Sequence, residues 1–518
     1  MISLPTVLDR KTYLIGGKVL DWTGPCAEVL SPMTQDQLEY GHAVSASDLA
    51  GAGIAGVPDP ARIVLGRSPL LTEAEALKAL EAARRAFSSG MGEWPSKSFS
   101  ERVRAVELFI SGIDRKKARI VETVMWEIAK PRREVEDEFD RTINFLRRII
   151  SDGAVLGRRT GRMRRDKGIF GRVAREPLGV ALCLGPYNYP IFETLSLVIP
   201  ALLAGNTVIM KPPRFGVLFF HDMIEDFAGC FPAGAANILF GDGERIVKPL
   251  MSSGGVDVLA FIGSAATANN LLSLHPGKNR LRSLLGLGAK NAAVVLDDAD
   301  LETAVRECLT GGLAFNGQRC AAIKIIFVQG RIAGRFLESI KEALGKVSIG
   351  MPWIDGVRIT PLADPERIPF LRQLVDDALD RGAEILNEGG GLAYGTILAP
   401  ALVFPVNPEM RLYHEEQFGP IIPVAPFQEI SQVILYVQQA SYGQQASVFG
   451  RNRAITDYFI KSVRTSVARV NVNSKCQRGP DVFPFTGRKE SAKGDFSSPA
   501  VLEFFSETFS VTRREREK

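Results

Sequence analysis

The spacing of hydrophobic residues predicts amphipathic helices in the first third of the chain. A helix is expected to begin near Thr72, because Thr72 and Glu75 form a capping box and apolar residues follow at three- and four-residue steps. A second amphipathic helix is expected over 101–113, and a highly charged one from about 132 to 148. The residues before them show no clear period, and the Gly-, Ala-, Ser- and Pro-rich stretch 45–60 predicts a surface loop or insertion.

Beyond Arg175 the pattern changes to short apolar runs that alternate with helix-length segments. The runs are 180–184, 207–210, 237–240 and 256–262, followed by 292–296, 323–328, 421–425 and 467–472. Such alternation is typical of parallel sheets with crossover helices, so the chain is expected to form two α/β lobes. Ligands of open parallel sheets bind at the carboxyl ends of the strands, so the turns after these runs are expected to carry the site.

Composition changes this picture little. The chain has 518 residues, 46% of them hydrophobic and 23% charged, and its 63 basic and 58 acidic side chains give no case for a nucleic-acid partner. The most apolar stretch, 195–210, is interrupted and too short to span a membrane, and the N-terminus does not resemble a signal peptide. Six widely spaced cysteines and four histidines without ligand spacing favour a cytoplasmic protein with reduced thiols and no metal site.

Two residues in the expected turns could carry chemistry. Cys320 follows Gly317-Gln-Arg, and the neighbouring Arg319 could favour its thiolate, although a lone cysteine is more often a small core residue. Asn188 is held between Pro186 and Pro190, so its amide could donate to an oxyanion, although turn geometry alone would also explain an asparagine there.

Two further turns could meet a phosphate or a sugar. Lys211 directly follows a buried strand and could reach a ligand or simply be solvated. The turn that begins at Gly241 could bring a helix N-terminus to a phosphate, or it could be a plain turn. Taken singly, none of these four signals decides the function.

Taken together, the segments resemble the aldehyde dehydrogenase superfamily over about residues 70–510. The resemblance lies in Glu176-Pro-Leu-Gly-Val180, Gly185-Pro-Tyr-Asn-Tyr-Pro190, Pro200–Val208, Lys211-Pro212, Phe261-Ile-Gly-Ser264, Gly317-Gln-Arg-Cys320 and Glu415-Glu-Gln-Phe-Gly-Pro420. It implies an α/β fold with two open domains, a Rossmann-like cofactor domain (1–153 and 177–288) and a catalytic domain (289–490). It also implies a small β oligomerisation element (154–176 and 495–518) that joins homodimers or homotetramers. In that element a strand pair near 154–176 would pair with the terminal run Val501–Arg513.

The resemblance also implies roles for individual residues. Cys320 would attack an aldehyde as a thiolate, and Asn188 and the Cys320 backbone N–H would hold the oxyanion. On the cofactor side, Lys211 would hold the adenosine ribose, Glu416 would hold the nicotinamide ribose, and Phe418, Gly241, Gly263 and Ser264 would line the cofactor. Arg214 stands where NAD-preferring relatives commonly place Glu, and because arginine pairs with phosphate it favours NADP, with NAD left open.

Within the superfamily the chain is most similar to the non-phosphorylating glyceraldehyde-3-phosphate dehydrogenases. That resemblance lies in Ala129-Lys-Pro131, Asp140-Arg-Thr142, Gln318–Lys324 and Gln477–Phe485. It implies a substrate-phosphate group made of Arg141, Tyr189, Arg319 and Arg478, since arginines give a dianion bidentate charge-assisted donors. The alternative is that these arginines form structural ion pairs.

One position departs from the family pattern. The family's general-base Glu opens a Glu-Leu-Gly-Gly-Lys stretch, which here is Gly286-Leu-Gly-Ala-Lys290. Such a base contributes roughly 10²–10⁴-fold to a reaction, so hydrolysis of a thioester on Cys320 is expected to be impaired or altered. Three outcomes remain open. Another group recruits the water, an external thiol takes the acyl group as in coenzyme A-dependent semialdehyde dehydrogenases, or the protein binds ligand with little catalysis.

Overall fold

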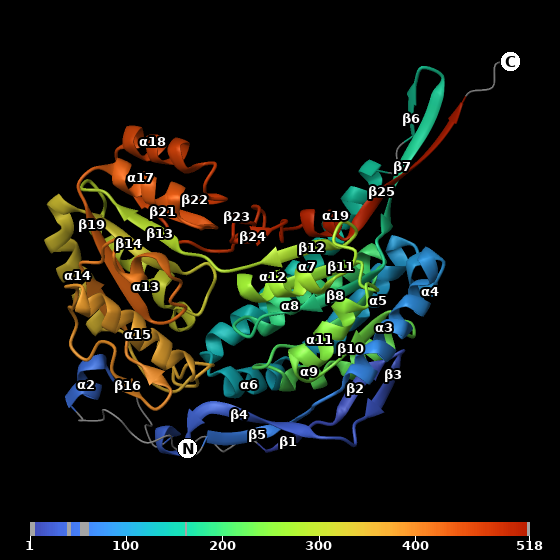
Figure 1. Ribbon diagram of the computed structural model, residues 1–518, viewed down its shortest axis with the longest axis horizontal. Coiled ribbons are helices and arrows are strands. Elements are labelled where there is room, and N and C mark those ends of the chain that lie inside the picture. The colour runs from blue at the N-terminus through green and yellow to red at the C-terminus, as the bar shows by residue number, and fades with distance from the viewer. Residues whose placement is uncertain (1–5, 39–42, 52–61, 161–162, 515–518) are drawn as a thin grey trace.

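Two α/β lobes and a projecting arm make up the computed structural model, which describes residues 6–38, 43–51, 62–160 and 163–514. In Figure 1 the green and most of the blue elements form one lobe, the orange elements form the other, and the arm projects from the first lobe. The predicted α/β architecture is confirmed.

The first lobe is built on an eight-stranded sheet in the order β24-β12-β11-β8-β9-β10-β2-β3. Its five parallel central strands are β12 (Arg282–Gly286), β11 (Val258–Ile262), β8 (Val180–Leu184), β9 (Thr207–Lys211) and β10 (Ala236–Ile238). The flanking strands β24 (Ala492–Lys493), β2 (Thr12–Ile15) and β3 (Lys18–Asp21) are antiparallel to their neighbours. Each apolar run predicted here as a strand is confirmed to within two residues.

Helices cover this sheet, and their ends follow the local sequence. They are α3 (Glu73–Phe87), α4 (Glu93–Ser96), α5 (Phe99–Asp114), α6 (Lys117–Ile128), α7 (Arg132–Thr160), α8 (Pro190–Ala204), α9 (Leu218–His221), α10 (Ile224–Cys230), α11 (Gly243–Ser252) and α12 (Ala265–Leu274). The predicted capping box of Thr72 and Glu75 starts α3, and a second one, Ser98 with Glu101, starts α5.

The second lobe is built on a seven-stranded sheet in the order β15-β18-β19-β14-β13-β21-β22. The strands are β15 (Glu384–Ile385), β18 (Ala401–Phe404), β19 (Ile421–Phe427), β14 (Ile323–Gln329), β13 (Asn291–Val295), β21 (Gln445–Phe449) and β22 (Arg469–Val472), and β15 alone among them is antiparallel. Its helices include α13 (Leu301–Leu313), α14 (Ala333–Gly345), α15 (Arg367–Asp380), α16 (Arg411–His414), α17 (Ile430–Gln439) and α18 (Arg453–Val463).

The N-terminal region holds structure that the hydrophobic pattern did not predict. β4 (Cys26–Thr34), β5 (Arg62–Pro69) and β1 (Leu8–Asp9) form a separate sheet. The register of β4 shifts against β5 twice, which breaks the strict alternation that would have marked a strand. Within the predicted loop 45–60, residues Ala46–Gly51 form helix α2, so the loop prediction is wrong there, and residues 52–60 lie outside the described residues.

The arm is a three-stranded antiparallel sheet of β25 (Ser506–Arg514), β7 (Ile169–Pro177) and β6 (Met163–Asp166). The predicted pairing of the internal strand pair with the C-terminal run is therefore present, but both boundaries were wrong. α7 continues to Thr160, because Gly153 lets it pack closely against Phe99 and Leu502. Residues Ala500–Phe504 form helix α19, whose Val501 and Leu502 are buried, and the strand begins only at Ser506.

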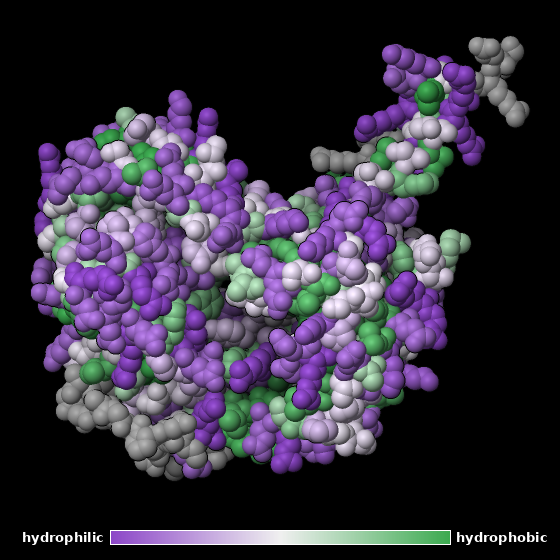
Figure 2. Space-filling view, in the orientation of Figure 1, coloured by the Kyte–Doolittle hydropathy of each residue, from purple (hydrophilic) through white to green (hydrophobic). Residues whose placement is uncertain are grey.

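Figure 2 shows that both lobes are largely hydrophilic on the face seen there, while hydrophobic side chains appear along the arm. Met163, Ile169, Phe509 and Val511 are exposed on its strands. No helix in the described ranges is long and apolar enough to cross a membrane.

Candidate active site

A pocket of about 840 Å³ opens between the two lobes, at the carboxyl ends of β8, β11 and β12. It is the place where parallel strands of the first sheet are expected to meet a ligand. The predicted site residues that line it are Arg141, Asn188, Tyr189, Arg214, Gly263, Ser264, Arg319, Cys320, Glu416, Phe418 and Arg478. Lys211 and Gly241 do not line it.

Cys320 comes from the second lobe, on the turn before β14. The preceding Gly317 has φ +70°, and a Cβ there would lie 2.6 Å from the Gly419 carbonyl oxygen, so the tight approach needs glycine. Lys324 Nζ and Asn291 Nδ2 each donate to the Cys320 carbonyl oxygen at 2.9 Å, which holds the turn. The Cys320 backbone N–H donates to no acceptor among the described residues and is therefore available to a ligand oxygen.

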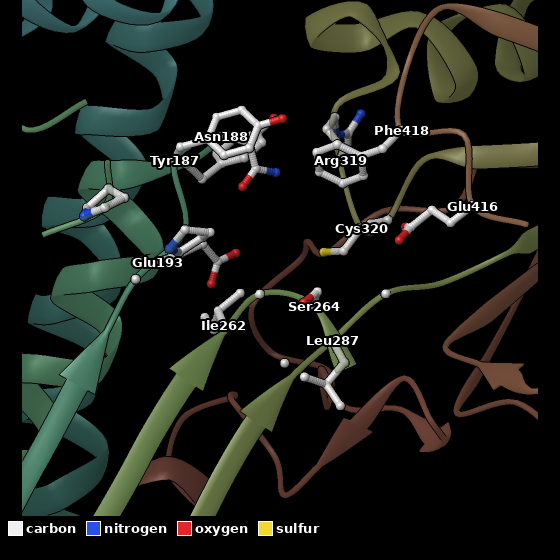
Figure 3. A pocket seen from close by; sticks show the side chains of 18 of the residues that line it. Tyr187, Asn188, Glu193, Ile262, Ser264, Leu287, Arg319, Cys320, Glu416 and Phe418 are labelled. Carbon is white, nitrogen blue, oxygen red and sulfur yellow. The ribbon is translucent and has the colours of Figure 1, made fainter. Parts of the chain in front are cut away.

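Asn188 comes from the first lobe and faces Cys320 across the pocket. Figure 3 shows Tyr187, Asn188 and Glu193 on one side, with Arg319, Cys320, Glu416 and Phe418 on the other. One N–H of the Asn188 amide donates to the Gln318 carbonyl oxygen at 2.7 Å. That bond links the two lobes next to the thiol and leaves the second N–H of the amide for a ligand.

The environment of Cys320 disfavours its thiolate when no ligand is bound. Burial raises the pKa of Cys320 above its ordinary value, and the negative charge of Glu193 raises it further. Lys324, a hydrogen bond from Gln444, and Arg478 act in the opposite direction. The charge of Glu193 and the charges of Lys324 and Arg478 therefore act on the pKa of the thiol in opposite directions.

The three predicted phosphate-binding arginines differ in their partners. Arg478 donates to the carboxylate of Glu193 in a buried ion pair, and Arg141 lies 2.6 Å from Asp481. Arg319 has no ion-pair partner among the described residues. Three arginines against two carboxylates leave this end of the pocket positively charged. Tyr189 lies beside them, with its ring 3.4 Å below the Lys130 ammonium.

The cofactor side combines a helix N-terminus with an exposed cation. Ser264 caps α12, and its side chain accepts from the Thr267 N–H. Arg214 is exposed at the pocket edge, with its guanidinium 5.2 Å from the Phe215 ring. Glu416 accepts from Lys324 Nζ at 2.7 Å and from the Ala289 N–H at 3.1 Å, so its position is fixed.

Lys211 and the turn at Gly241 do not line the pocket between the lobes. Lys211 donates to the Pro212 carbonyl oxygen, and burial lowers its pKa to about 8, with Asp242 opposing the shift. Asp242 also caps α11 by accepting from the Glu244 and Arg245 N–H groups. The N-terminus of α11 is therefore already satisfied by a carboxylate of the protein.

Gly286 ends β12 at the floor of the pocket, next to Cys320. A Cβ at this position would lie 3.1 Å from the Phe496 ring and 3.2 Å from Ile262. Those two side chains crowd the space that a longer residue at 286 would enter. The carboxylate expected from the family pattern is absent, as the sequence indicated.

Glu193 and the buried pair of Lys130 and Glu138 were not predicted from the sequence. Glu193 lies in the first turn of α8, where it is the one charged residue in a 15-residue helix that is otherwise apolar or uncharged. A lone carboxylate in such a helix was the available signal, because burial of a charge requires a partner or a function. All six cysteines are free, and the described residues contain no cluster of metal-ligating side chains.

Comparison with known proteins places these features in one family. A model described as "Aldehyde dehydrogenase family" matches residues 56–511. The NADP-dependent glyceraldehyde-3-phosphate dehydrogenase of Streptococcus equinus is 31% identical over 439 residues, which cover 83% of this chain and 89% of that protein. The enzyme of the same name from Triticum aestivum is 31% identical over 86% of this chain and 88% of its own. A solved structure of NADP-dependent glyceraldehyde-3-phosphate dehydrogenase from Bacillus halodurans, complexed with NADP, is 30% identical with a TM-score of 0.86, covering 98% of this chain and 100% of that one.

Proposed function

Because the chain belongs to the aldehyde dehydrogenase family, we propose that it oxidises an anionic aldehyde, with glyceraldehyde 3-phosphate as the first candidate, to the acid with NADP. The observation that carries the proposal is that Cys320, Asn188 and Arg319 line one pocket, although they come from both lobes. That arrangement places a nucleophile, an oxyanion donor and a cation for the substrate around one space.

The residues support a covalent mechanism. Cys320, as a thiolate, attacks the aldehyde carbon, and the electron pair of the carbonyl bond moves to the oxygen. The Asn188 amide and the Cys320 N–H donate to that oxyanion, and each such donor contributes roughly 10²–10³-fold to the rate. A bound nicotinamide supplies the hydride acceptor. Loss of hydride from the carbon leaves a thioester on the Cys320 sulfur.

The cofactor side fits a phosphorylated dinucleotide. The uncapped N–H groups in the first turn of α12 suit a pyrophosphate, and Gly263 and Ser264 keep that approach open. Arg214 would pair with a 2′-phosphate, which supports NADP over NAD. Glu416 and Lys211 would hold the two riboses, Phe418 would pack near the nicotinamide, and Gly241 would form the turn beside the adenosine.

The substrate end suits an anion. Arg319 would take the phosphate directly, and Arg141, Arg478 and Tyr189 would complete the group around it. The ion pairs of Arg141 and Arg478 mean that a phosphate must share these cations with Asp481 and Glu193. A dianion therefore gains most from Arg319, whose charge no carboxylate of the described residues neutralises in an ion pair.

A second candidate follows from Gly286. The position that supplies the water-activating carboxylate in the family carries no side chain here, so an external thiol such as coenzyme A could take the acyl group. That reaction needs no base at 286, because a thiol loses its proton to solvent far more readily than water does and then attacks as a thiolate.

The first lobe would be the cofactor domain and the second lobe the catalytic domain. The arm strands β6, β7 and β25 would form the oligomerisation element. β6 and β25 are free edges of the arm sheet, and free edges with exposed apolar residues favour pairing with another chain. A homodimer or homotetramer built through the arm is therefore proposed.

The test is a rapid-mixing experiment with enzyme, NADP and glyceraldehyde 3-phosphate. The expected result is a burst of reduced cofactor equal to the enzyme concentration, with an acyl adduct on Cys320 in the intact mass. The Cys320→Ser variant is the control and should give neither signal. Adding coenzyme A separates the two candidates, because only acyl transfer gives a thioester product. Absence of both burst and adduct in the wild type would contradict the proposal.

A further inference from the structure

We propose that Glu193 is the base that activates water for hydrolysis of the thioester on Cys320, in place of the carboxylate missing at Gly286. The inference rests on the proposed function for the thioester itself. Glu193 lies outside the segments that resemble the family motifs.

The first observation is a small cavity beside the thiol. It has a volume of about 20 Å³ and is lined by Glu193, Gly286, Cys320 and Arg478, with Ile262 and Phe496. Ile262 and Phe496 are also the side chains that a Cβ at 286 would meet first. The cavity is therefore the space that a side chain at 286 would enter, and its volume is enough for about one water molecule.

The second observation is the placement of Glu193. It lies in the first turn of α8, five residues after Asn188, and its side chain is buried. Figure 3 shows its carboxylate and the Cys320 sulfur pointing into the same space from opposite sides. The negative charge of Glu193 is felt at the sulfur, because it raises the pKa of Cys320. A water in the small cavity would lie between the carboxylate and an acylated sulfur.

The third observation is that Glu193 is held in place. Arg478 donates to it, and the guanidinium of Arg478 itself lies 4.5 Å from the Phe192 ring and 4.6 Å from the Phe485 ring. A base that is fixed in position needs no rearrangement before it accepts a proton. No donor to the second oxygen of the carboxylate is found among the described residues, so that oxygen is available to water.

The other carboxylates of the pocket are less suitable. Four described carboxylates line the large pocket: Glu193, Asp364, Glu415 and Glu416. Both oxygens of Glu415 accept from Arg411, one from Nε and one from Nη2, which leaves neither for water. Glu416 accepts from Lys324 and the Ala289 N–H and does not line the small cavity. Of the four, only Glu193 also lines the small cavity with Cys320 and Gly286.

The step balances without any further reactant. As the water oxygen bonds to the thioester carbon, one water proton passes to the Glu193 carboxylate, and the carbonyl electron pair moves to the oxygen held by Asn188. When the carbonyl re-forms, the carbon–sulfur bond breaks and its electron pair stays on the Cys320 sulfur. The product leaves as a carboxylate. The proton of the acid product passes to solvent. The proton on Glu193 passes to solvent or to the Cys320 thiolate, and this restores the enzyme.

The test uses p-nitrophenyl acetate, which acylates a reactive thiol without cofactor or aldehyde. Release of nitrophenol in a burst measures acylation of Cys320, and the steady-state rate measures hydrolysis of the acetyl thioester. The Glu193→Gln variant keeps the volume of the side chain and removes the base. We expect an unchanged burst amplitude, a steady-state rate lower by roughly 10²–10⁴-fold, and an acetyl adduct that persists in the intact mass.

The Asp364→Asn variant is the matched control, because Asp364 lines the large pocket but not the small cavity. It should keep both phases. Hydroxylamine, a nucleophile that attacks a thioester without help from a general base, should restore the steady-state rate of Glu193→Gln. This rescue would not follow if the substitution had disturbed the pocket by releasing Arg478 from its ion pair.

Three results would overturn the assignment: both phases unchanged in Glu193→Gln, a burst lost together with the steady state in that variant, or a wild type that acylates and never deacylates. A wild type that shows no burst at all would instead remove Cys320 as the nucleophile and with it the proposed function. The two failures are therefore distinguishable.

Discussion

Lys130 Nζ lies 2.6 Å from Glu138 Oε2, and both side chains are fully buried. Lys130 also donates to the Asn188 carbonyl oxygen, and the other oxygen of Glu138 accepts the N–H groups of Ile191 and Phe192. One ion pair thus joins the turn that carries Asn188 to the first turn of α8, which carries Glu193.

Replacing Lys130 with Met should therefore destabilise the protein and disturb the site. Removing one partner of a buried pair leaves an uncompensated charge, and we expect a loss of about 3–5 kcal/mol in the free energy of unfolding, measured by urea titration. Lys117→Met is the matched control, because Lys117 and Asp140 form an ion pair that is partly exposed. That variant should lose less than about 1 kcal/mol. Equal losses in the two variants would contradict this view of the pair.

Arg214 is expected to set the preference between the two cofactors. Arg214→Glu replaces a cation at the pocket edge with a charge that repels a 2′-phosphate, whereas Arg214→Gln removes the charge alone. A charge-assisted hydrogen bond contributes about 1.5–3 kcal/mol, so kcat/KM for NADP should fall by about ten- to a hundredfold in the Gln variant and further in the Glu variant. The rate with NAD should change little in the Gln variant. A parallel fall with both cofactors would show that Arg214 does not contact the 2′-phosphate.

Much of this arrangement could be predicted from the sequence. The strand positions followed from short apolar runs, because both faces of these strands are buried and the runs are nearly continuous. The order of motifs identified the family, which the family match over 56–511 confirms. The pocket then brings together eleven of the thirteen predicted site residues.

The parts that were missed depend on packing that a one-dimensional pattern does not contain. The charged helix was predicted to span about 132–148, yet α7 continues to Thr160, and its Gly153 packs against Leu502 from the other end of the chain. The partners of Arg478 and Arg141 lie 285 and 340 residues away. Their ion pairs, and hence the sharing of charge in the substrate end, could be seen only in the structure.

Arg319 should discriminate between phosphorylated and neutral aldehydes. Arg319→Gln removes the one arginine of the group that has no ion pair among the described residues. The substrate phosphate therefore loses a full positive charge that would otherwise face it. We expect KM for glyceraldehyde 3-phosphate to rise by about ten- to a hundredfold, with much less effect on glyceraldehyde itself. Steady-state kinetics with the two substrates measures the ratio. An equal change for both would indicate that Arg319 acts on Cys320 rather than on the phosphate.

The thiol of Cys320 should react more slowly at neutral pH than an exposed cysteine. Burial and then Glu193 raise the pKa of Cys320, so the rate of alkylation by iodoacetamide in the free enzyme should rise about tenfold for each pH unit between 7 and 9. Glu193→Gln removes one of the two causes and should speed alkylation at pH 8, in the opposite direction to its expected effect on hydrolysis. Mass spectrometry of the Cys320 peptide measures the rate site by site, with Cys320→Ser as the blank. Slower alkylation in Glu193→Gln would mean that its charge does not act on the sulfur.

Glu127 should make the stability of the protein depend on pH. Its two carboxylate oxygens accept the N–H groups of Val217 and Leu218, next to the pocket residues Pro213–Phe215, and burial raises its pKa to about 7. Between the ordinary value of 4.5 and 7, the folded protein holds the proton and the unfolded chain releases it. Stability therefore falls as pH rises through this window, by up to about 3 kcal/mol.

The Glu127→Gln variant isolates that contribution, because every other titrating group is shared with the wild type. The amide still gives one oxygen to these N–H groups but leaves the second unpaired, so the variant should be less stable at every pH. Urea unfolding at pH 5 and pH 8 should show a larger loss with rising pH in the wild type than in the variant. The difference between the two proteins should therefore shrink from pH 5 to pH 8. A difference that stays constant would show that Glu127 does not titrate in this range, and one that grows would show that its charged form is the one the fold prefers.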